Sequence, residues 1–304
     1  MSYIKITESE WKIMRVLWEY SPISSKDIIG IFHGINDWSP TTIKTFISRL
    51  VGNNVISFHQ ENNKQMYFPL ITEKECVENE MIATIHKVYG GTETLALDHF
   101  VFYGNDDESY IHLLSENIEE QYERVATNLN FRFTEKQSIY LYSSLKRLHS
   151  ALGYHNGPKW IKAGCPWGVL HIAPHDSFVG EDPRQILMHI IVQKMLYKIN
   201  PDIPAWLSQG IAAYESKWLD TNRIKKVLNS QHEFINLSNL EYKDNDIQLF
   251  QQNGGYELSF LFVEYIIDKY GYILIQKFIS NPSLCNNQII QEWNSHLQLL
   301  NEGD

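Results

Sequence analysis

Apolar residues recur at helical spacing in three segments of the first 52 residues. The first segment begins with a capping box made by Thr7 and Glu10, and the second begins near Ser24. The third follows Ser39-Pro40, a capping residue and a proline that suits the first helical turn. Apolar residues at i, i+3, i+4, i+7 and i+8 of this third segment predict one complete buried face: Ile43, Phe46, Ile47, Leu50 and Val51.

Two short runs of alternating polar and apolar residues follow, near residues 55–59 and 65–69, and Asn62-Asn63 provides a turn between them. Three helices and a hairpin in this order predict a winged helix-turn-helix domain over residues 1–78. We expect residues 79–92 to form a helical connector that ends in a hinge at Tyr89-Gly90-Gly91-Thr92.

The rest of the chain, residues 93–304, mixes strand patterns with helical patterns and predicts an α+β domain. The chain as a whole is therefore expected to be mainly α with α+β elements. Strands are predicted at residues 100–103, 138–143 and 166–173, and helices at 145–152, 256–270 and 273–279 and in a long segment that ends near 129.

Residues 182–215 predict two helices joined by a proline-containing break. Asp182 is a capping residue and Pro183 suits the first helical position; the helix that follows is apolar nearly all round, which predicts burial. The second helix begins near Ala205, and Glu215 at its end is expected to be exposed. On periodicity alone this is a buried helix pair with His189 as a core histidine.

The composition is typical of a globular protein, with 43% hydrophobic and 20% charged residues among 304. The formal net charge of −10 argues against coating of nucleic acid by the whole chain, but not against one small DNA-reading module. Three unpatterned cysteines favour a reducing compartment, and no signal peptide or bilayer-length apolar run is visible. We therefore expect a cytoplasmic protein without a membrane partner.

The outer face of the third predicted helix carries short hydroxyl side chains that allow close approach to base edges, and cations that reach phosphates or guanine. Residues 1–78 nevertheless contain eight basic and nine acidic residues, a net charge of −1. Ordinary solvated residues, or a protein-docking module, therefore remain alternatives to DNA binding. The candidate DNA-binding residues on this helix are Thr41, Thr42, Lys44, Thr45, Ser48 and Arg49.

A resemblance favours DNA binding. The stretches TESEWKIMRVLW, WSPTTIKTFISRL and ISFHQENNKQMYF resemble the penicillinase-repressor family, whose members are homodimeric repressors on palindromic operators. The resemblance covers about the first 75 residues and implies that Thr42, Lys44, Thr45 and Arg49 contact operator DNA, with the wing near Asn63 and Lys64 on the backbone. Family members follow the wing with a short dimerisation segment, so the long remainder of this chain leaves its mode of dimerisation open.

A second resemblance concerns the segment DPRQILMHIIVQKMLYKINPDIPAWLSQGIAAYE, which resembles the active-site core of the gluzincin metallopeptidases of the peptidase MA-like type. There the first helix carries HExxH and the second a glutamate in a W-L-x-E-G-x-A-x-Y frame. Here the first histidine is His189, but Ile190 stands at the general base, and Gln193 and Gln209 at the other two ligand positions. The resemblance implies a C-terminal gluzincin-like (zincin) domain over residues 93–304 without peptidase activity.

The sequence therefore predicts a transcriptional regulator, and more specifically a repressor, whose inactive peptidase-like domain senses a peptide or small-molecule effector, serves dimerisation, or both. We assign no cofactor and no metal. The alternatives are a metallopeptidase with a non-standard metal site and a scaffold that does not bind DNA. Three histidines, His171, His175 and His189, are the only visible candidates for a replacement metal site, and solvated or hydrogen-bonded roles are favoured for them.

Overall fold

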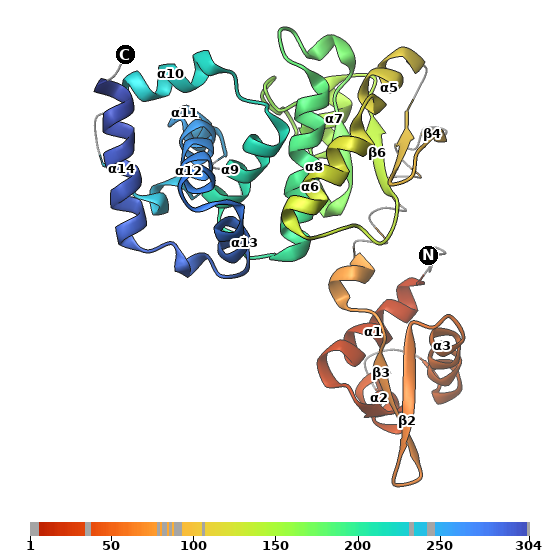
Figure 1. Ribbon diagram of the computed structural model, residues 1–304. Helices are drawn as coiled ribbons and strands as arrows, with labels where there is room; N and C mark the ends of the chain where they lie inside the picture. Colours follow the sequence, from red (N-terminus) through yellow and green to blue (C-terminus); the bar gives the residue numbers. More distant parts are fainter. Residues whose placement is uncertain are drawn as a thin grey trace. The chain divides into compact units, whose positions relative to one another are not determined.

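A computed structural model describes residues 6–33, 38–77, 80, 84, 87, 93–104, 107–230, 234–241 and 247–302 of the chain. The chain divides into two compact units, Met1–Tyr89 and Gly90–Asp304 (Figure 1). The hinge expected at Tyr89–Thr92 lies outside the described residues. Within the described residues, no helix is long and apolar enough to cross a bilayer.

The first unit has three helices and a three-stranded antiparallel sheet of order β1-β3-β2. The hairpin β2–β3 follows the third helix directly, which is the element order of a winged helix-turn-helix. Strand β1 precedes α2 and adds a third strand that the sequence patterns did not predict. The elements are α1 (Glu8–Tyr20), β1 (Ile23–Ser24), α2 (Ser25–Phe32), α3 (Pro40–Gly52), β2 (Ile56–Glu61) and β3 (Lys64–Pro69).

Local signals explain these element boundaries. The Thr7 backbone N–H donates to Glu10 Oε2 at 2.9 Å and the Thr7 hydroxyl receives the Glu10 N–H, which completes the capping box expected at α1. Ser39 caps α3 in the same way through the Thr42 N–H. The apolar faces of the three helices then share one core, in which Ile13, Leu17 and Ile43 are almost completely buried.

The wing is closed by a two-residue loop. Asn62 and Asn63 have φ values of 47° and 60°, and Glu61 pairs with Lys64 in the antiparallel ladder. Positive φ at both central positions matches the right-handed twist of the flanking strands, and asparagine adopts this conformation more readily than most residues. The turn predicted at Asn62-Asn63 is confirmed.

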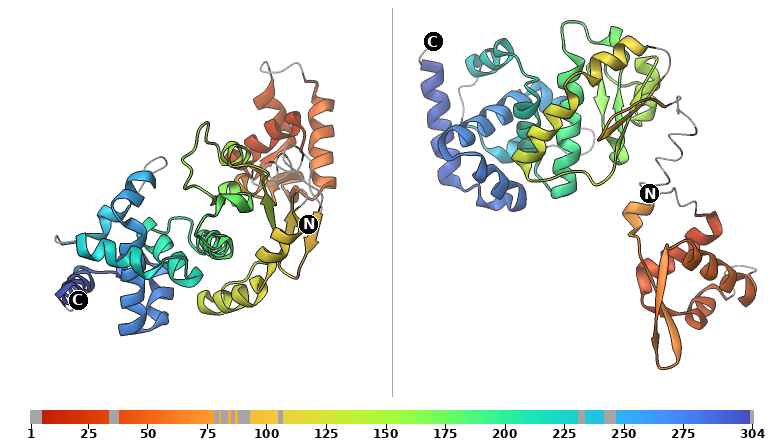
Figure 2. Two further views of the ribbon diagram at one scale, coloured as in Figure 1. Left: turned by 90° about the horizontal axis from the view of Figure 1, so that it is seen from above. Right: turned by 45° about the vertical axis from the view of Figure 1, so that its right-hand side comes forward.

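The second unit contains a five-stranded mixed sheet of order β4-β5-β6-β8-β7 (Figure 1). The three central strands are parallel, and the two edge strands β4 and β7 run antiparallel to their neighbours. Beside this sheet, α8 (Pro183–Ile199) contacts β7 and β8, and α5 (Glu108–Ser115) and α6 (Ile118–Leu129) pack on α8 (Figure 2). The strands are β4 (Glu93–Ala96), β5 (Phe100–Tyr103), β6 (Gln137–Leu141), β7 (Ala163–Gly164) and β8 (Leu170–Ile172).

The other part of the second unit is helical. Helix α9 packs on both α8 and α12, and it approaches α12 so closely that a Cβ on Gly210 would lie 2.3 Å from the Ser259 carbonyl oxygen. The helices of this unit are α5 (Glu108–Ser115), α6 (Ile118–Leu129), α7 (Leu145–Ala151), α8 (Pro183–Ile199), α9 (Ala205–Ser216), α10 (Thr221–Ser230), α11 (Ile247–Gln252), α12 (Gly255–Tyr270), α13 (Tyr272–Ser280) and α14 (Asn287–Glu302).

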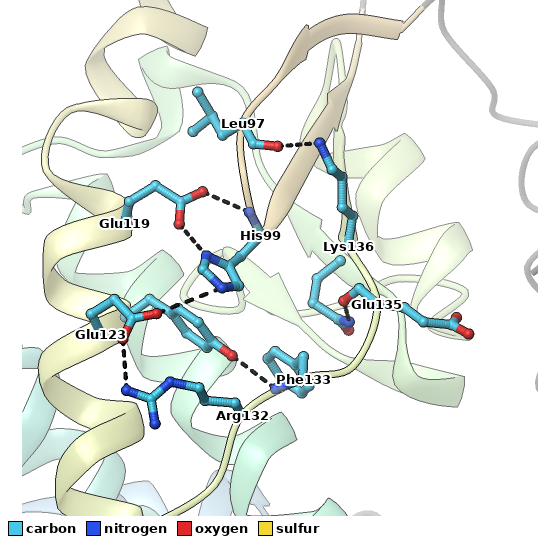
Figure 3. A network of polar contacts seen from close by, with 10 residues as sticks. Leu97, His99, Glu119, Glu123, Arg132, Phe133, Glu135 and Lys136 are labelled. Atoms are coloured by element: carbon cyan, nitrogen blue, oxygen red, sulfur yellow. Dashed lines mark hydrogen bonds and ion pairs between the residues drawn. The ribbon is translucent and has the colours of Figure 1, made fainter.

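A polar network joins the start of β5 to α6 (Figure 3). The His99 ring lies between two carboxylates one helical turn apart, with Nδ1 2.5 Å from Glu119 Oε2 and Nε2 3.6 Å from Glu123 Oε1. Glu119 also accepts the His99 backbone N–H at 2.9 Å, and Arg132 pairs with Glu123 at 2.8 Å. The network therefore fixes the loop that leads into β5 against the solvent face of α6.

Two expectations about the second unit were wrong in detail. The strand expected over residues 166–173 is shorter, because Pro166–Gly168 forms a 3-10 turn and the ladder starts only at Leu170. Helices α10 and α11 lie between α9 and α12, where no element was predicted, although Ile224, Val227 and Leu228 of α10 stand at helical spacing.

Candidate functional site

The outer face of α3 presents the polar residues expected there. Thr41, Lys44, Thr45, Ser48 and Arg49 are exposed. The remaining candidate on this helix, Thr42, is half-buried, and its hydroxyl lies 2.8 Å from the Ser39 hydroxyl at the cap. The Thr45 hydroxyl donates to the Thr41 carbonyl at 3.0 Å.

The cations on the exposed face of α3 and at the wing tip have no acidic partner among the described residues. Lys44 and Arg49 make no ion pair with any described residue, and the same holds for Lys64 at the wing. Asn63 and Lys64 are both exposed at the tip of the hairpin. Two cations of α3 that have no described acidic partner thus lie on a unit whose formal net charge is close to zero.

The second candidate site is a cavity of about 320 Å³ in the second unit. All four residues at the peptidase-like positions line it: His189, Ile190 and Gln193 from α8 and Gln209 from α9. The spacing of one helical turn brings His189 and Gln193 to the same face of α8, and the α8–α9 packing brings Gln209 beside them.

The geometry around His189 is that of a neutral hydrogen-bonded imidazole. Its Nε2 lies 3.0 Å from Gln209 Oε1, so Nε2–H donates to the amide oxygen. Burial lowers the pKa of His189 to about 4, and the contacts with Gln209 and the Ala212 backbone oppose that shift only in part. Of the two ring nitrogens that could bind a metal, Nε2 is therefore engaged by the Gln209 amide.

The walls of the cavity carry charged groups that are already paired. Lys162 forms an ion pair with Glu181, and both line the cavity. Arg223 Nη2 lies 2.7 Å from Glu257 Oε1, and the guanidinium stands 4.9 Å from the centre of the Trp218 ring. Sequence reasoning missed these pairs, since their members are 19 and 34 residues apart and only the fold brings them together.

The three histidines considered for a replacement metal site are not brought together. His171 is fully buried and its Nδ1 lies 2.7 Å from the Tyr142 hydroxyl, while His175 is exposed and stacks on Tyr110 with ring centres 4.9 Å apart. Within the part of the chain that the structure describes, no group of three or more His, Cys, Asp or Glu side chains is arranged to hold a metal ion.

Glu215, expected to be exposed, is buried, and that expectation was wrong. Its carboxylate forms an ion pair with Arg124 and accepts from Asn128 Nδ2 at 2.9 Å. A signal was present in the sequence: Glu215 falls four residues after Ile211 and so shares the buried face of α9. Burial of a carboxylate requires such partners, which lie in α6 and could not be identified from the pattern.

The fold of the first unit is thus that of the winged helix-turn-helix class. Comparison with known proteins then assigns the family: residues 6–120 match the penicillinase repressor family, and the chain belongs to it. The match extends past Tyr89 into the second unit and ends within α6.

Three relatives illustrate the extent of the similarity. The chain is 30% identical over 88 residues to the penicillinase repressor of Bacillus licheniformis, which covers 29% of this chain and 69% of the relative. It is 33% identical over 95 residues to the methicillin resistance regulatory protein MecI of Staphylococcus aureus strain N315, covering 31% and 77%. An uncharacterised 16.5 kDa protein from Latilactobacillus sakei is 36% identical over 75 residues, covering 25% of this chain and about half, 51%, of the relative.

Proposed function

We propose that this protein is a DNA-binding transcriptional repressor that reads operator DNA as a homodimer, with α3 in the major groove and the β2–β3 wing on the backbone. The observation that carries the proposal is the exposed α3 face, where Lys44 and Arg49 stand free of described acidic partners. Hydroxyls between them permit close approach to base edges. Family membership supports the same conclusion, since the relatives are named as repressors and regulators.

The test is binding of the full chain to the DNA upstream of its own gene, titrated with salt. Lys44→Ala and Arg49→Ala should each weaken binding about ten-fold, and each should reduce the salt slope by about 0.9 if a phosphate contact is lost. Lys74→Ala, which removes an exposed lysine of the first unit beyond the wing, is the matched control and should bind like the wild type. Equal binding of all three variants, or no preference over random DNA, would contradict the proposal and favour a protein-docking role.

For the second unit we propose a gluzincin-like domain that has lost peptidase chemistry and retains a ligand-sensing cavity. His189 is hydrogen-bonded to Gln209 rather than free, and Ile190 cannot accept a proton. A cavity of about 320 Å³ at these four positions favours sensing over a role in dimerisation alone. The purified protein is expected to contain no stoichiometric zinc and to cleave no peptide.

Restoring the ligands tests the gluzincin likeness directly. The double variant Gln193→His and Gln209→Glu places two histidines four residues apart and a carboxylate opposite them, as zinc requires. It should bind one zinc ion per chain, measured by elemental analysis and by the visible spectrum of the cobalt form. A folded double variant that gains no metal affinity would show that α8 and α9 do not have the gluzincin arrangement.

A further inference from the structure

Among the residues that the structure describes, those that line the cavity of the second unit offer no unpaired charge to a ligand. Its charged lining residues are Lys162, Glu181 and Arg223; the first two neutralise each other, and Arg223 is held by the buried Glu257. His189 is buried and hydrogen-bonded to an amide. A charged ligand would lose its hydration without meeting a free counter-charge, a cost of several kcal/mol per ion in order of magnitude.

The cavity does offer two side-chain amides that have no partner among the described residues. Gln193 of α8 is half-buried and its side chain makes no hydrogen bond with any described residue. Gln251 of α11 lines the same cavity and likewise has no described side-chain partner. Each carboxamide presents two N–H donors and a carbonyl acceptor, a combination that another carboxamide matches and that an acceptor-only carboxylate does not.

The remaining surface of the cavity is largely aromatic and aliphatic. Trp160 and Ile186 contribute to the wall, and Trp218 and Tyr256 meet edge to face with ring centres 5.1 Å apart. An apolar or aromatic group of a ligand that packs on these walls is removed from water, which makes the free energy of binding more favourable. The volume of about 320 Å³ lies at the lower end for small-molecule sites, which limits the bound part to a small group.

We propose that the cavity binds a small uncharged ligand that carries a carboxamide, hydrogen-bonded to Gln193, on an aromatic or aliphatic body. This inference rests on the ligand-sensing role proposed above for the second unit and is independent of DNA binding. It assigns to Gln193 a recognition role that replaces the metal-binding role of its position, and it excludes anions and cations as preferred ligands.

Three probes that differ in charge test the proposal on the full chain. At pH 6, N-acetyl-phenylalaninamide is neutral, N-acetyl-phenylalanine is an anion and phenylalaninamide is almost entirely a cation. Isothermal titration calorimetry should show binding of the neutral amide, with the anion and the cation at least ten-fold weaker. Gln193→Leu should weaken binding of the neutral amide at least ten-fold, because the ligand's carboxamide then loses its hydrogen-bonding partner in the cavity.

The control is Gln298→Leu, the same substitution at an exposed position of α14. It should bind the neutral amide like the wild type. Comparable affinity for the anion or the cation would overturn the proposal, as would unchanged binding by Gln193→Leu or no binding of the neutral amide at millimolar concentration. Operator binding is measured separately on the same preparations, so failure of the ligand proposal and failure of the repressor proposal are distinguished.

Discussion

The two units differ in where their candidate polar residues lie: on the surface of the first unit and in the interior of the second. In the first, Lys44 and Arg49 lie on the solvent face of an amphipathic helix and are free of described ion pairs. In the second, His189 and Gln209 lie inside, on helices buried nearly all round, and bond to each other. A surface site of the first kind follows from a helical pattern, whereas an internal site of the second kind depends on which buried helices meet.

Two helical glycines, one from each unit, differ in how closely other elements approach them. Gly210 lies inside α9, where an added Cβ would clash with the Ser259 carbonyl at 2.3 Å. Gly30 lies in α2, where an added Cβ would meet nothing within 4 Å. Four predictions, taken from the largest expected effect to the smallest, test this comparison. Two concern the packing at Gly210 and Gly30, and two concern the buried polar groups of the second unit.

The largest effect is expected from Gly210→Ala. The contact is with backbone of α12 and cannot be relieved by a side-chain rotation, so the two helices must separate. We expect a loss of about 3 kcal/mol, the upper end for overpacking, in the free energy of unfolding of the second unit. Hydrogen exchange of the full chain should show faster exchange in α9 and α12 and no change in α3. Unchanged protection in α9 would contradict the close approach of these helices.

The second effect depends on pH. Burial lowers the pKa of His189 to about 4 from an ordinary value of 6.5. Between these values the unfolded chain binds the proton and the folded chain does not, so stability falls as the pH falls from 7 toward 4. The His189 contribution is about 2 kcal/mol between pH 7 and pH 5. Urea unfolding of His189→Leu should show a correspondingly weaker pH dependence, and the exposed His155→Leu should behave like the wild type.

A smaller loss is expected from Glu215→Gln. The amide keeps the shape of the side chain but removes the negative charge. That charge pairs with Arg124 and strengthens the hydrogen bond that the carboxylate accepts from Asn128 Nδ2. Because the Arg124 side chain is 43% exposed and can regain water, we expect a loss of about 1.5 kcal/mol rather than that of a fully buried pair. Glu116→Gln, at an exposed pair with Arg184, is the matched control and should change stability by less than about 0.5 kcal/mol.

Glu215 also shows where inference from the sequence alone fails. The helices α1, α3, α8 and α9 were predicted close to their observed bounds, because caps and prolines mark their ends. The α3 face followed from the same pattern. Glu215, Lys162 and Arg223 each pair with a residue of a different segment. The packing that brings each pair together leaves no local signal in the sequence.

The smallest effect, opposite in sign, is expected from Gly30→Ala. The position is inside α2, its backbone needs no positive φ, and the added methyl group meets no atom within 4 Å. Alanine lowers the conformational entropy of the unfolded chain and favours helix, so we expect the first unit to gain about 0.5–1 kcal/mol. Hydrogen exchange in α1 and α3 should slow while that in α9 stays the same. A loss of stability would mean that α2 is as closely packed as α9, and the contrast between the two units would then rest on their polar chemistry alone.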